Sequence, residues 1–119
     1  MKDNYETPSW LMELFKDWFD PCPLNPKRDG LSIEWQDKTY VNPPYSNPLK
    51  WVEKAIEESK KGKLIVMLLR VDTSTKWFAK LVEAKAEILW FNKRLKFIDG
   101  RPANFPSMLV IIKRAKAGV

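Results

Sequence analysis

Apolar residues recur along the chain at two spacings, and these spacings predict where helices and strands lie. Three segments, 7–18, 47–61 and 72–83, repeat apolar residues every three or four positions, as helices with one buried face do. Between and after them come apolar runs of strand length. The predicted strands are 18–20, 39–42, 64–69, 86–91 and 108–112, with a further short strand around 31–35.

The first helix has start signals and an apolar stripe. Thr7 is suited to its N-cap and Pro8 to its first helical position. The apolar residues share one helical face, so we expect that face to be buried. They are Trp10, Leu11, Leu14, Phe15 and Trp18.

The other two helices have similar signals. Asn47 and Pro48 are suited to the cap and first turn of the second helix, and Gly62 to its end. Segment 72–74 supplies capping residues for the third helix. We expect the charged residues of the second helix to face solvent. They are Lys50, Glu53, Lys54, Glu57 and Glu58.

The order of elements predicts an α/β fold. Strands that alternate with helices favour a mostly parallel sheet with right-handed crossovers. Segment 64–69 is continuously apolar, as a strand covered on both faces is. The last two strands are separated only by a loop, so we expect an antiparallel strand at the edge of the sheet.

Polar residues follow three of the predicted strands. Asp20, Asn42 and segment 70–72 each come directly at a strand end. In sheets of this kind, ligands gather beyond the carboxyl ends of the strands. The sequence therefore predicts a functional site at that edge.

The turn 42–46, Asn-Pro-Pro-Tyr-Ser, is the most informative segment. Its prolines cannot donate to a sheet ladder and leave little conformational freedom. The turn presents the Asn42 amide, the Pro43 carbonyl and the Tyr45 ring together. Such a set can hold a flat ring that carries an amine, because carbonyls accept from the amine and the aromatic ring stacks on its face. In the alternative interpretation, Asn42 only makes a local turn bond.

Composition narrows the class of protein. The 119 residues, 45% of them hydrophobic, predict one globular domain, and the net charge of +6 favours an anionic partner such as nucleic acid. The single cysteine fits a reducing compartment, and the absence of histidine removes His-based catalysis and the usual zinc ligands. We expect no metal. With no apolar run of membrane-spanning length and no signal peptide, we expect a cytosolic protein in a prokaryotic or viral host cell.

Taken together, these motifs resemble the phage-type DNA adenine-N6 methyltransferases, which are Dam-like, S-adenosylmethionine-dependent amino-methyltransferases. Asn-Pro-Pro-Tyr alone also resembles turns of glutamine and RNA-guanine methyltransferases, but the ordered set of segments is specific and covers nearly the whole chain. The matching segments are 5–8 with 10–11, residues 20 and 25, 29–31 with 35, 42–46, 51–55, 68–69, 75–78, 86–88, 94–97 and 105–109.

The resemblance implies a Rossmann-like methyltransferase fold in a pared-down form. The interval from Asp20 to Thr39 is too short for the further strands and helices of a full methyltransferase sheet. Residues 1–119 then form a single minimal methyltransferase domain, without a separate target-recognition domain. From the small size we expect a homodimer, which would add surface for contact with DNA.

The resemblance also implies residue roles. The enzyme would transfer a methyl group from S-adenosyl-L-methionine to the exocyclic amine of an adenine flipped out of double-stranded DNA. The catalytic turn would be Asn42, Pro43, Pro44 and Tyr45. The residues that bind the cofactor would be Tyr5, Thr7, Pro8, Asp20, Pro21, Cys22, Asn25 and Asn42.

Two departures from the family pattern stand out. Segment 21–24, Pro-Cys-Pro-Leu, replaces the glycine-rich turn after the first strand. The acid that grips the cofactor ribose has no secure counterpart, and Asp29, Glu34 and Asp37 are the candidates. Cys22 is interpreted as a small packing or cofactor-side residue rather than a nucleophile, because it follows the wrong strand and no Glu-Asn-Val segment accompanies it.

The expected DNA contacts leave alternatives open. Arg70 and Asp72 either contact DNA or form a surface pair, and the basic residues of the last loop either bind phosphate or form a solvated face. The alternative functions are an RNA or protein-glutamine methyltransferase with the same turn and a catalytically inactive DNA-binding remnant. The expected DNA-binding residues are Ser46, Arg70, Asp72, Lys93, Arg94, Lys96 and Arg101.

Overall fold

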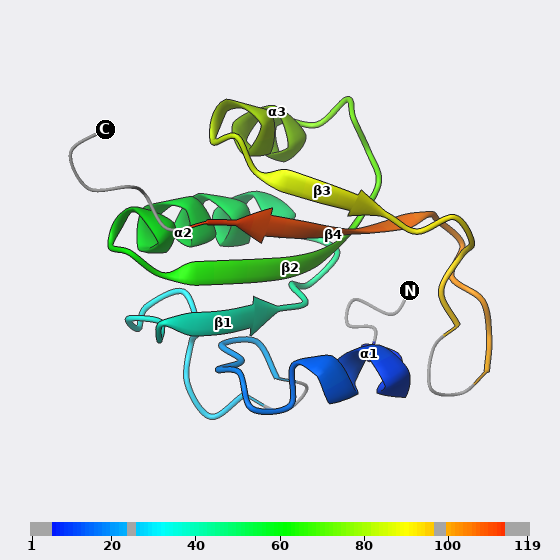
Figure 1. Ribbon diagram of the computed structural model, residues 1–119, viewed down its shortest axis with the longest axis horizontal. Coiled ribbons are helices and arrows are strands. Elements are labelled where there is room, and N and C mark those ends of the chain that lie inside the picture. The colour runs from blue at the N-terminus through cyan, green and yellow to red at the C-terminus, as the bar shows by residue number, and fades with distance from the viewer. Residues whose placement is uncertain (1–5, 24–25, 97–99, 114–119) are drawn as a thin grey trace.

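A computed structural model describes residues 6–23, 26–96 and 100–113, which form a four-stranded sheet with helices on both faces (Figure 1). None of the helices in these ranges is long and apolar enough to cross a membrane. The elements in chain order are α1 Ser9–Leu14, β1 Lys38–Val41, α2 Pro48–Lys60, β2 Leu64–Arg70, α3 Lys76–Glu83, β3 Glu87–Trp90 and β4 Ser107–Ile112.

The sheet is mixed, with the strand order β1-β2-β4-β3. β1 and β2 pair in parallel, whereas β4 pairs antiparallel with both β2 and β3, as the arrows in Figure 1 show. The prediction of a mostly parallel sheet was therefore wrong, whereas the antiparallel pair predicted at the edge is present, with β3 at the edge and β4 inside it. The reason is burial: five of the six residues of β4 are buried, whereas three of the four residues of β3 are exposed. The inner position goes to the strand that is apolar on both faces.

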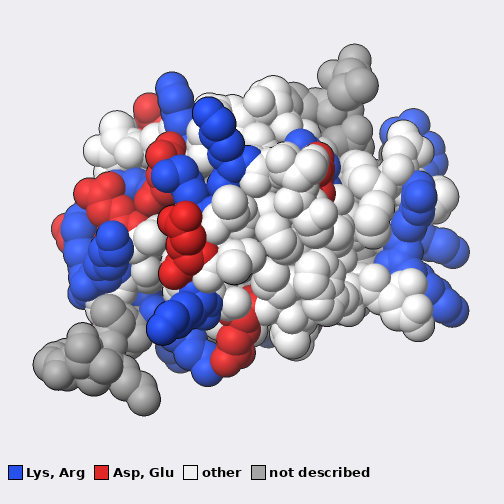
Figure 2. All heavy atoms as spheres, turned by 90° about the horizontal axis from the view of Figure 1, so that it is seen from above, with Lys and Arg blue, Asp and Glu red and all other residues white. Residues whose placement is uncertain are grey.

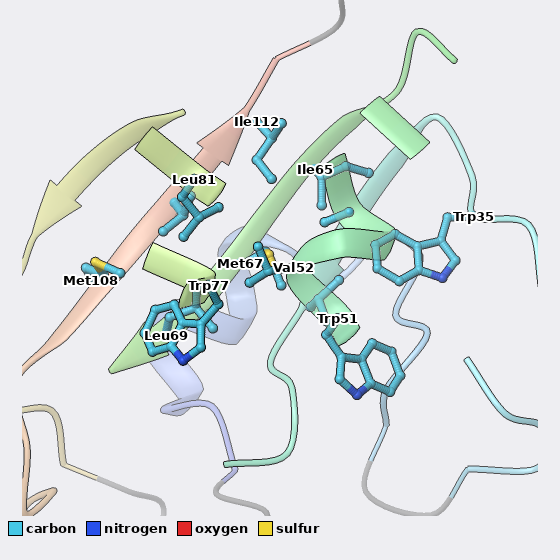
Figure 3. Packing of buried hydrophobic residues seen from close by; sticks show 13 residues of the cluster. Trp35, Trp51, Val52, Ile65, Met67, Leu69, Trp77, Leu81, Met108 and Ile112 are labelled. Atoms are coloured by element: carbon cyan, nitrogen blue, oxygen red, sulfur yellow. The ribbon is translucent and has the colours of Figure 1, made fainter. Parts of the chain in front are cut away.

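One face of the sheet is covered by α2 and α3 (Figure 3). Residues from both helices pack on alternate residues of β2 and β4, and Trp35 joins them from the chain before β1. Each large apolar side chain buried in this way contributes about 1.5–3 kcal/mol. The main members are Trp35, Trp51, Val52, Ile65, Met67, Leu69, Trp77, Leu81, Met108 and Ile112.

The other face of the sheet is covered by α1 and by Leu95. Val66 and Leu68 of β2 are buried there, which confirms that segment 64–69 is covered on both faces. The predicted apolar stripe of α1 is only partly buried. Leu11 is 1% exposed, but Trp10 is 55% and Leu14 is 65% exposed. The helix has only six residues, so it is too short to lay a whole face on the sheet.

Two of the predicted helix caps differ in the structure. Pro8, not Thr7, is the N-cap of α1, and the hydroxyl of Thr7 bonds to Tyr40 instead. The cap of α3 is Thr75, whose hydroxyl accepts from the Phe78 N–H at 3.2 Å. The start of α2 was predicted correctly, with Asn47 as N-cap, although its side chain makes no capping bond.

The chain between α1 and β1 contains neither of the two predicted strands. Phe19 makes a single parallel bridge to Thr39, and residues 31–35 form no strand. Tertiary bonds hold this segment instead. The indole N–H of Trp35 donates to the Gly30 carbonyl at 2.8 Å, and the Trp35 backbone N–H donates to the carboxylate of Glu58.

Glu58 is a buried charge, contrary to the expectation that it faces solvent. It is 0% exposed, and its two carboxylate oxygens lie 3.0 Å from the ammonium of Lys63 and 2.7 Å from that of Lys61. Burial alone would raise the pKa of Glu58, but the hydrogen bonds from Lys61, Trp35 and Lys63 outweigh it and hold the pKa at about 2. This carboxylate ties the chain before β1 to the end of α2 and the start of β2.

We expect Gly30→Ala to destabilise the protein. A Cβ atom at this position would lie 1.9 Å from the Pro21 carbonyl oxygen and 2.8 Å from the Trp51 ring, so the backbone must shift. Overpacking of this kind costs about 1–3 kcal/mol or more. Urea unfolding measures it, and Arg28→Ala, at an exposed position two residues earlier, is the control. Equal midpoints for Gly30→Ala and the wild type would contradict the close approach.

Candidate active site

The Asn-Pro-Pro-Tyr turn lies at the carboxyl end of β1, where the sequence predicts it. Pro43 is buried, and Asn42 and Tyr45 are half-buried. Arg70, the last residue of the neighbouring strand β2, donates from its guanidinium to the Tyr45 carbonyl at 3.3 Å. The Tyr45 ring packs against Phe105 at a centroid distance of 4.8 Å. The turn is therefore held both from β2 and from the chain just before β4.

The Asn42 amide is bound to a distant part of the chain. Its Nδ2 donates to the Thr7 hydroxyl oxygen at 3.2 Å, across 35 positions of sequence. The same Thr7 oxygen lies 2.9 Å from the hydroxyl of Tyr40. Thr7 is 8% exposed and Tyr40 is 1% exposed. The interpretation in which Asn42 makes only a local turn bond was therefore wrong.

Asp20 lies at the same edge of the sheet as the turn, because the preceding residue is bridged to β1. Phe19 pairs with Thr39 of β1, so Asp20 follows at the carboxyl end. Burial raises the pKa of the Asp20 carboxyl, although the Cys22 N–H, which donates to it at 2.9 Å, acts in the opposite direction. A carboxylate with this environment gains from a cationic partner. Pro21 is buried and Cys22 is half-buried beside it.

The space beside the turn is small. A cavity of about 10 Å³ is lined by residues of the turn and by Leu69, Arg70 and Trp77, and a volume of that size holds about one water molecule. Larger hollows of about 890 Å³ and 560 Å³ lie between α2 and α3 and near the start of β1. Asp37, a candidate for the ribose acid, lines the second, whereas the described residues predicted to be catalytic or to bind cofactor or DNA line neither. A nucleobase can therefore enter this cavity only if a side chain moves.

Arg70 and Asp72 form the surface pair that was one of their two interpretations. Their nearest charged atoms lie 3.9 Å apart, and the Arg70 guanidinium lies 5.4 Å from the centre of the Trp77 ring. Hydrogen bonds from the hydroxyl and backbone N–H of Ser74 lower the pKa of Asp72. The contacts of Arg70 thus join the Asn-Pro-Pro-Tyr turn to the start of the chain that leads into α3.

The predicted basic residues lie on the connection between β3 and β4. In Figure 2, basic side chains gather at the end of the molecule where this connection lies, whereas acidic and basic groups mix at the opposite end. Leu95 is buried and fixes the connection. Trp10, which the apolar pattern places in the core, instead meets Phe91 edge-on at 6.0 Å and is more than half exposed. The basic residues, all exposed, are Lys93, Arg94, Lys96 and Arg101.

The three candidates for the ribose acid do not join the site. Glu34 binds Lys63 at 3.2 Å, just before β2 begins, and the Asp37 carbonyl accepts from Leu64 at the start of β2. Both lie at the amino ends of the strands, opposite the Asn-Pro-Pro-Tyr turn, and Asp29 caps a local turn. Tyr5 and Asn25 lie outside the described residues. Within the described ranges, no group of three or more Asp, Glu, Cys or His residues could hold a metal ion.

Comparison with known proteins identifies the family. The model of the family "DNA N-6-adenine-methyltransferase (Dam)" matches residues 1–118. The DNA N-6-adenine-methyltransferase of Haemophilus phage HP1 (strain HP1c1) is 35% identical over 137 residues, which cover 94% of this chain and 79% of that protein. The enzyme of the same name from Escherichia phage T1 is 45% identical over 62 residues, which cover 51% of this chain and 26% of that protein. No solved structure matches. With the Asn-Pro-Pro-Tyr turn at the carboxyl edge of its sheet, the chain belongs to the DNA N-6-adenine-methyltransferase (Dam) family.

Proposed function

We propose that this enzyme transfers a methyl group from S-adenosyl-L-methionine to N6 of an adenine flipped out of double-stranded DNA. The observation that carries the proposal is the Asn-Pro-Pro-Tyr turn at the sheet edge, with the Asn42 amide held by Thr7, in a chain of the Dam family. Asp20 reaches the same edge and supplies a carboxylate for the cationic methyl donor.

The chemistry follows from the weakness of the nucleophile. The lone pair of adenine N6 is delocalised into the ring, so the amine attacks poorly. The side-chain carbonyl of Asn42 and the main-chain carbonyl of Pro43 accept the two amine hydrogens, which favours a pyramidal nitrogen and stabilises its developing positive charge. The bound methyl donor supplies a methyl group on a sulfonium. Alignment and electrostatics provide most of the rate effect, and the proton leaves to water afterwards, because Asn42 is no base.

Base entry requires Tyr45 to move. The cavity of about 10 Å³ beside the turn cannot take a purine, so the Tyr45 ring must leave Phe105 and stack on the flipped base. The bond from Arg70 to the Tyr45 carbonyl holds the backbone while the ring turns. The turn thus keeps its two carbonyls in place during base entry.

The donor set at the edge fits S-adenosyl-L-methionine by its chemistry. Asp20 is a partly desolvated carboxylate, which gains when it pairs with the amino group of the cofactor. Pro8, at the start of α1, and Pro21, directly after Asp20, are buried and stiffen the chain at these two positions. Asp20 therefore holds the cofactor, with Thr7 and Cys22 beside it.

We expect Asp20→Asn to weaken cofactor binding by about 10- to 100-fold, because a hydrogen bond between charged groups contributes about 1.5–3 kcal/mol. Since burial raises the pKa of Asp20 in the ligand-free protein, wild-type affinity should fall as pH falls through that raised pKa, whereas the variant should show a flat profile. Calorimetry measures both, with exposed Asp29→Asn as the control. Equal affinity for Asp20→Asn and the wild type would remove Asp20 from the cofactor site.

We also propose that the fold is a pared-down Rossmann-like methyltransferase fold. In support, β1, α2 and β2 form a parallel strand–helix–strand unit, and the single bridge from Phe19 to Thr39 lies where a further parallel strand would pair. The short chain between Asp20 and Thr39 is anchored through Trp35, whose backbone N–H donates to the Glu58 carboxylate. A crystal structure with the cofactor bound tests this assignment.

The basic connection between β3 and β4 is proposed to contact DNA phosphates. Its lysines and arginines are exposed (Figure 2), and the connection lies at the end of the sheet at which β1 ends (Figure 1). Trp10 and Phe91 extend this surface with aromatic rings at the start of the connection. Counterion release would supply much of the affinity.

We expect Arg94→Ala to weaken DNA binding and to lower the slope of log K against log salt by about 0.9, which corresponds to one phosphate contact. Exposed Lys60→Ala, in the last turn of α2, is the control and should leave the slope unchanged. Fluorescence anisotropy over a salt series measures it. If both variants had the wild-type slope, Arg94 would belong to a solvated basic face.

The proposed function is tested with labelled S-adenosylmethionine on four substrates: duplex DNA, duplex DNA without adenine, RNA and protein. We expect labelling of the first alone. Labelled RNA or protein would favour the alternative methyltransferases, and no heat of cofactor binding in calorimetry would favour a DNA-binding remnant. Long-read sequencing of DNA from cells that express the chain would give the modified base and its motif. The homodimer stays a prediction.

A further inference from the structure

A short chain of hydrogen bonds lies behind the catalytic amide. Tyr40, Thr7 and Asn42 are linked in that order, at 2.9 Å and 3.2 Å. Tyr40 and Thr7 are buried, and the Tyr40 ring stacks on Phe15 at 4.6 Å with an interplanar angle of 15°. The two hydroxyl groups are therefore fixed in place by packing around them.

The direction of these bonds decides which atom Asn42 can offer to a substrate. The structure has the Asn42 amide nitrogen donating to Thr7, so the amide oxygen is directed away from Thr7. A hydroxyl group has one hydrogen and can either donate or accept. If Thr7 donated its hydrogen to Asn42, the amide would be inverted, with its oxygen facing Thr7 instead of a substrate. Thr7 acts as acceptor toward Asn42 without competition when its own hydrogen goes to Tyr40.

Tyr40 is suited to take that hydrogen. Burial raises the pKa of its phenol above the ordinary value, and the nearby carboxylate of Asp20 adds to the rise, so the ring stays neutral. A neutral phenol oxygen is an acceptor that holds its state across the working pH range. The orientation of the Asn42 amide would thus be determined by Tyr40, which acts on it through Thr7.

We infer that Thr7 and Tyr40 are positioning residues, which hold the Asn42 carboxamide with its oxygen directed to the adenine amine. The inference rests on the proposed function, because it concerns the acceptor that methyl transfer needs. It gives Thr7 a role in addition to the cofactor contact that family resemblance implies. It also gives a role to a buried tyrosine that the site prediction left out.

The kinetic test compares three variants in single-turnover methylation. We expect Tyr40→Phe and Thr7→Val each to lower the rate constant by about 10- to 100-fold, since misplacement of a reacting group costs about that much. In Tyr40→Phe the KM for cofactor should stay within about twofold of wild type, and Thr7→Ser, which keeps the hydroxyl, should restore the rate lost in Thr7→Val to within about threefold. Thr39→Val is the matched control. It removes another buried hydroxyl, one that donates to the Gln36 carbonyl, from the neighbouring position of β1.

A second readout does not depend on activity. The side-chain NH₂ resonances of Asn42, assigned by their loss in Asn42→Ala, should shift in Tyr40→Phe and Thr7→Val and stay in place in Thr39→Val. Unchanged resonances and unchanged rates in both variants would overturn the inference. So would a Thr7→Val effect confined to the KM for cofactor, which would make Thr7 a cofactor contact alone. If the wild type methylates nothing, the proposed function fails, while the resonances still test the hydrogen-bond chain.

Discussion

Asn42→Ala is expected to lower methyl transfer by about 10²–10³-fold, the effect seen when one preorganised polar group is removed from a charge-stabilising site. The side-chain carbonyl of Asn42 is one of two acceptors that would localise the lone pair of adenine N6. Pro43 supplies the other acceptor from its main chain, which the substitution leaves intact. Partial activity is therefore expected to remain rather than none.

The control for this variant is Asn47→Ala, the same change five positions further along. Asn47 is the N-cap residue of α2 and makes no side-chain capping bond, so its loss should leave both rate and stability nearly unchanged. Single-turnover labelling at saturating cofactor measures the rate, and circular dichroism checks the fold. Wild-type turnover in Asn42→Ala would remove the amide from the mechanism.

The largest stability effect is expected from Glu58→Gln, at about 3–5 kcal/mol. Gln keeps the shape of the side chain but removes the charge that neutralises Lys63, which is only 6% exposed. The Trp35 N–H also loses a charged acceptor at this position, so the anchor of the chain before β1 weakens. The protein would unfold at lower urea concentration.

Glu57→Gln, one position earlier on the exposed side of α2, is the control and should change stability by no more than about 0.5 kcal/mol. Urea unfolding of the three proteins at neutral pH gives the midpoints and slopes. A wild-type midpoint for Glu58→Gln would mean that Lys63 is neutralised well enough without Glu58, for example by Glu34, which lies 3.2 Å from it.

Lowering the pH should reduce the stability that the Glu58 carboxylate contributes. The pKa of Glu58 is about 2 in the folded protein and 4.5 when unperturbed, so the unfolded chain binds more protons between these values. Stability due to Glu58 is therefore complete above pH 4.5 and is lost as pH falls toward 2. Over this range the wild type should lose more stability than Glu58→Gln. Equal losses would contradict the depressed pKa.

Local sequence signals determined much of the fold and of the turn. The apolar period of α2 and α3, Pro48 in the first turn and the unbroken apolar run of β2 depend on interactions between near neighbours, which are visible in the sequence. The Asn-Pro-Pro-Tyr turn could also be predicted from local sequence, because a proline cannot donate to a sheet ladder and so ends a strand. Its place at the carboxyl edge followed from the direction of β1.

Only the tertiary structure decided how distant segments meet. The insertion of β4 between β2 and β3, the burial of Glu58 beside Trp35 and the hydrogen bonds that link Thr7 with Tyr40 and Asn42 join residues 18 or more positions apart. Neither hydrophobic periodicity nor a helix-capping residue indicates such contacts. Each of them depends on which apolar faces pack together and which buried polar groups form hydrogen bonds in the folded chain. From the sequence alone, a charged residue on a helix is predicted to face solvent. Glu58 is buried instead because the fold places the Trp35 N–H and the ammonium groups of Lys61 and Lys63 next to its carboxylate.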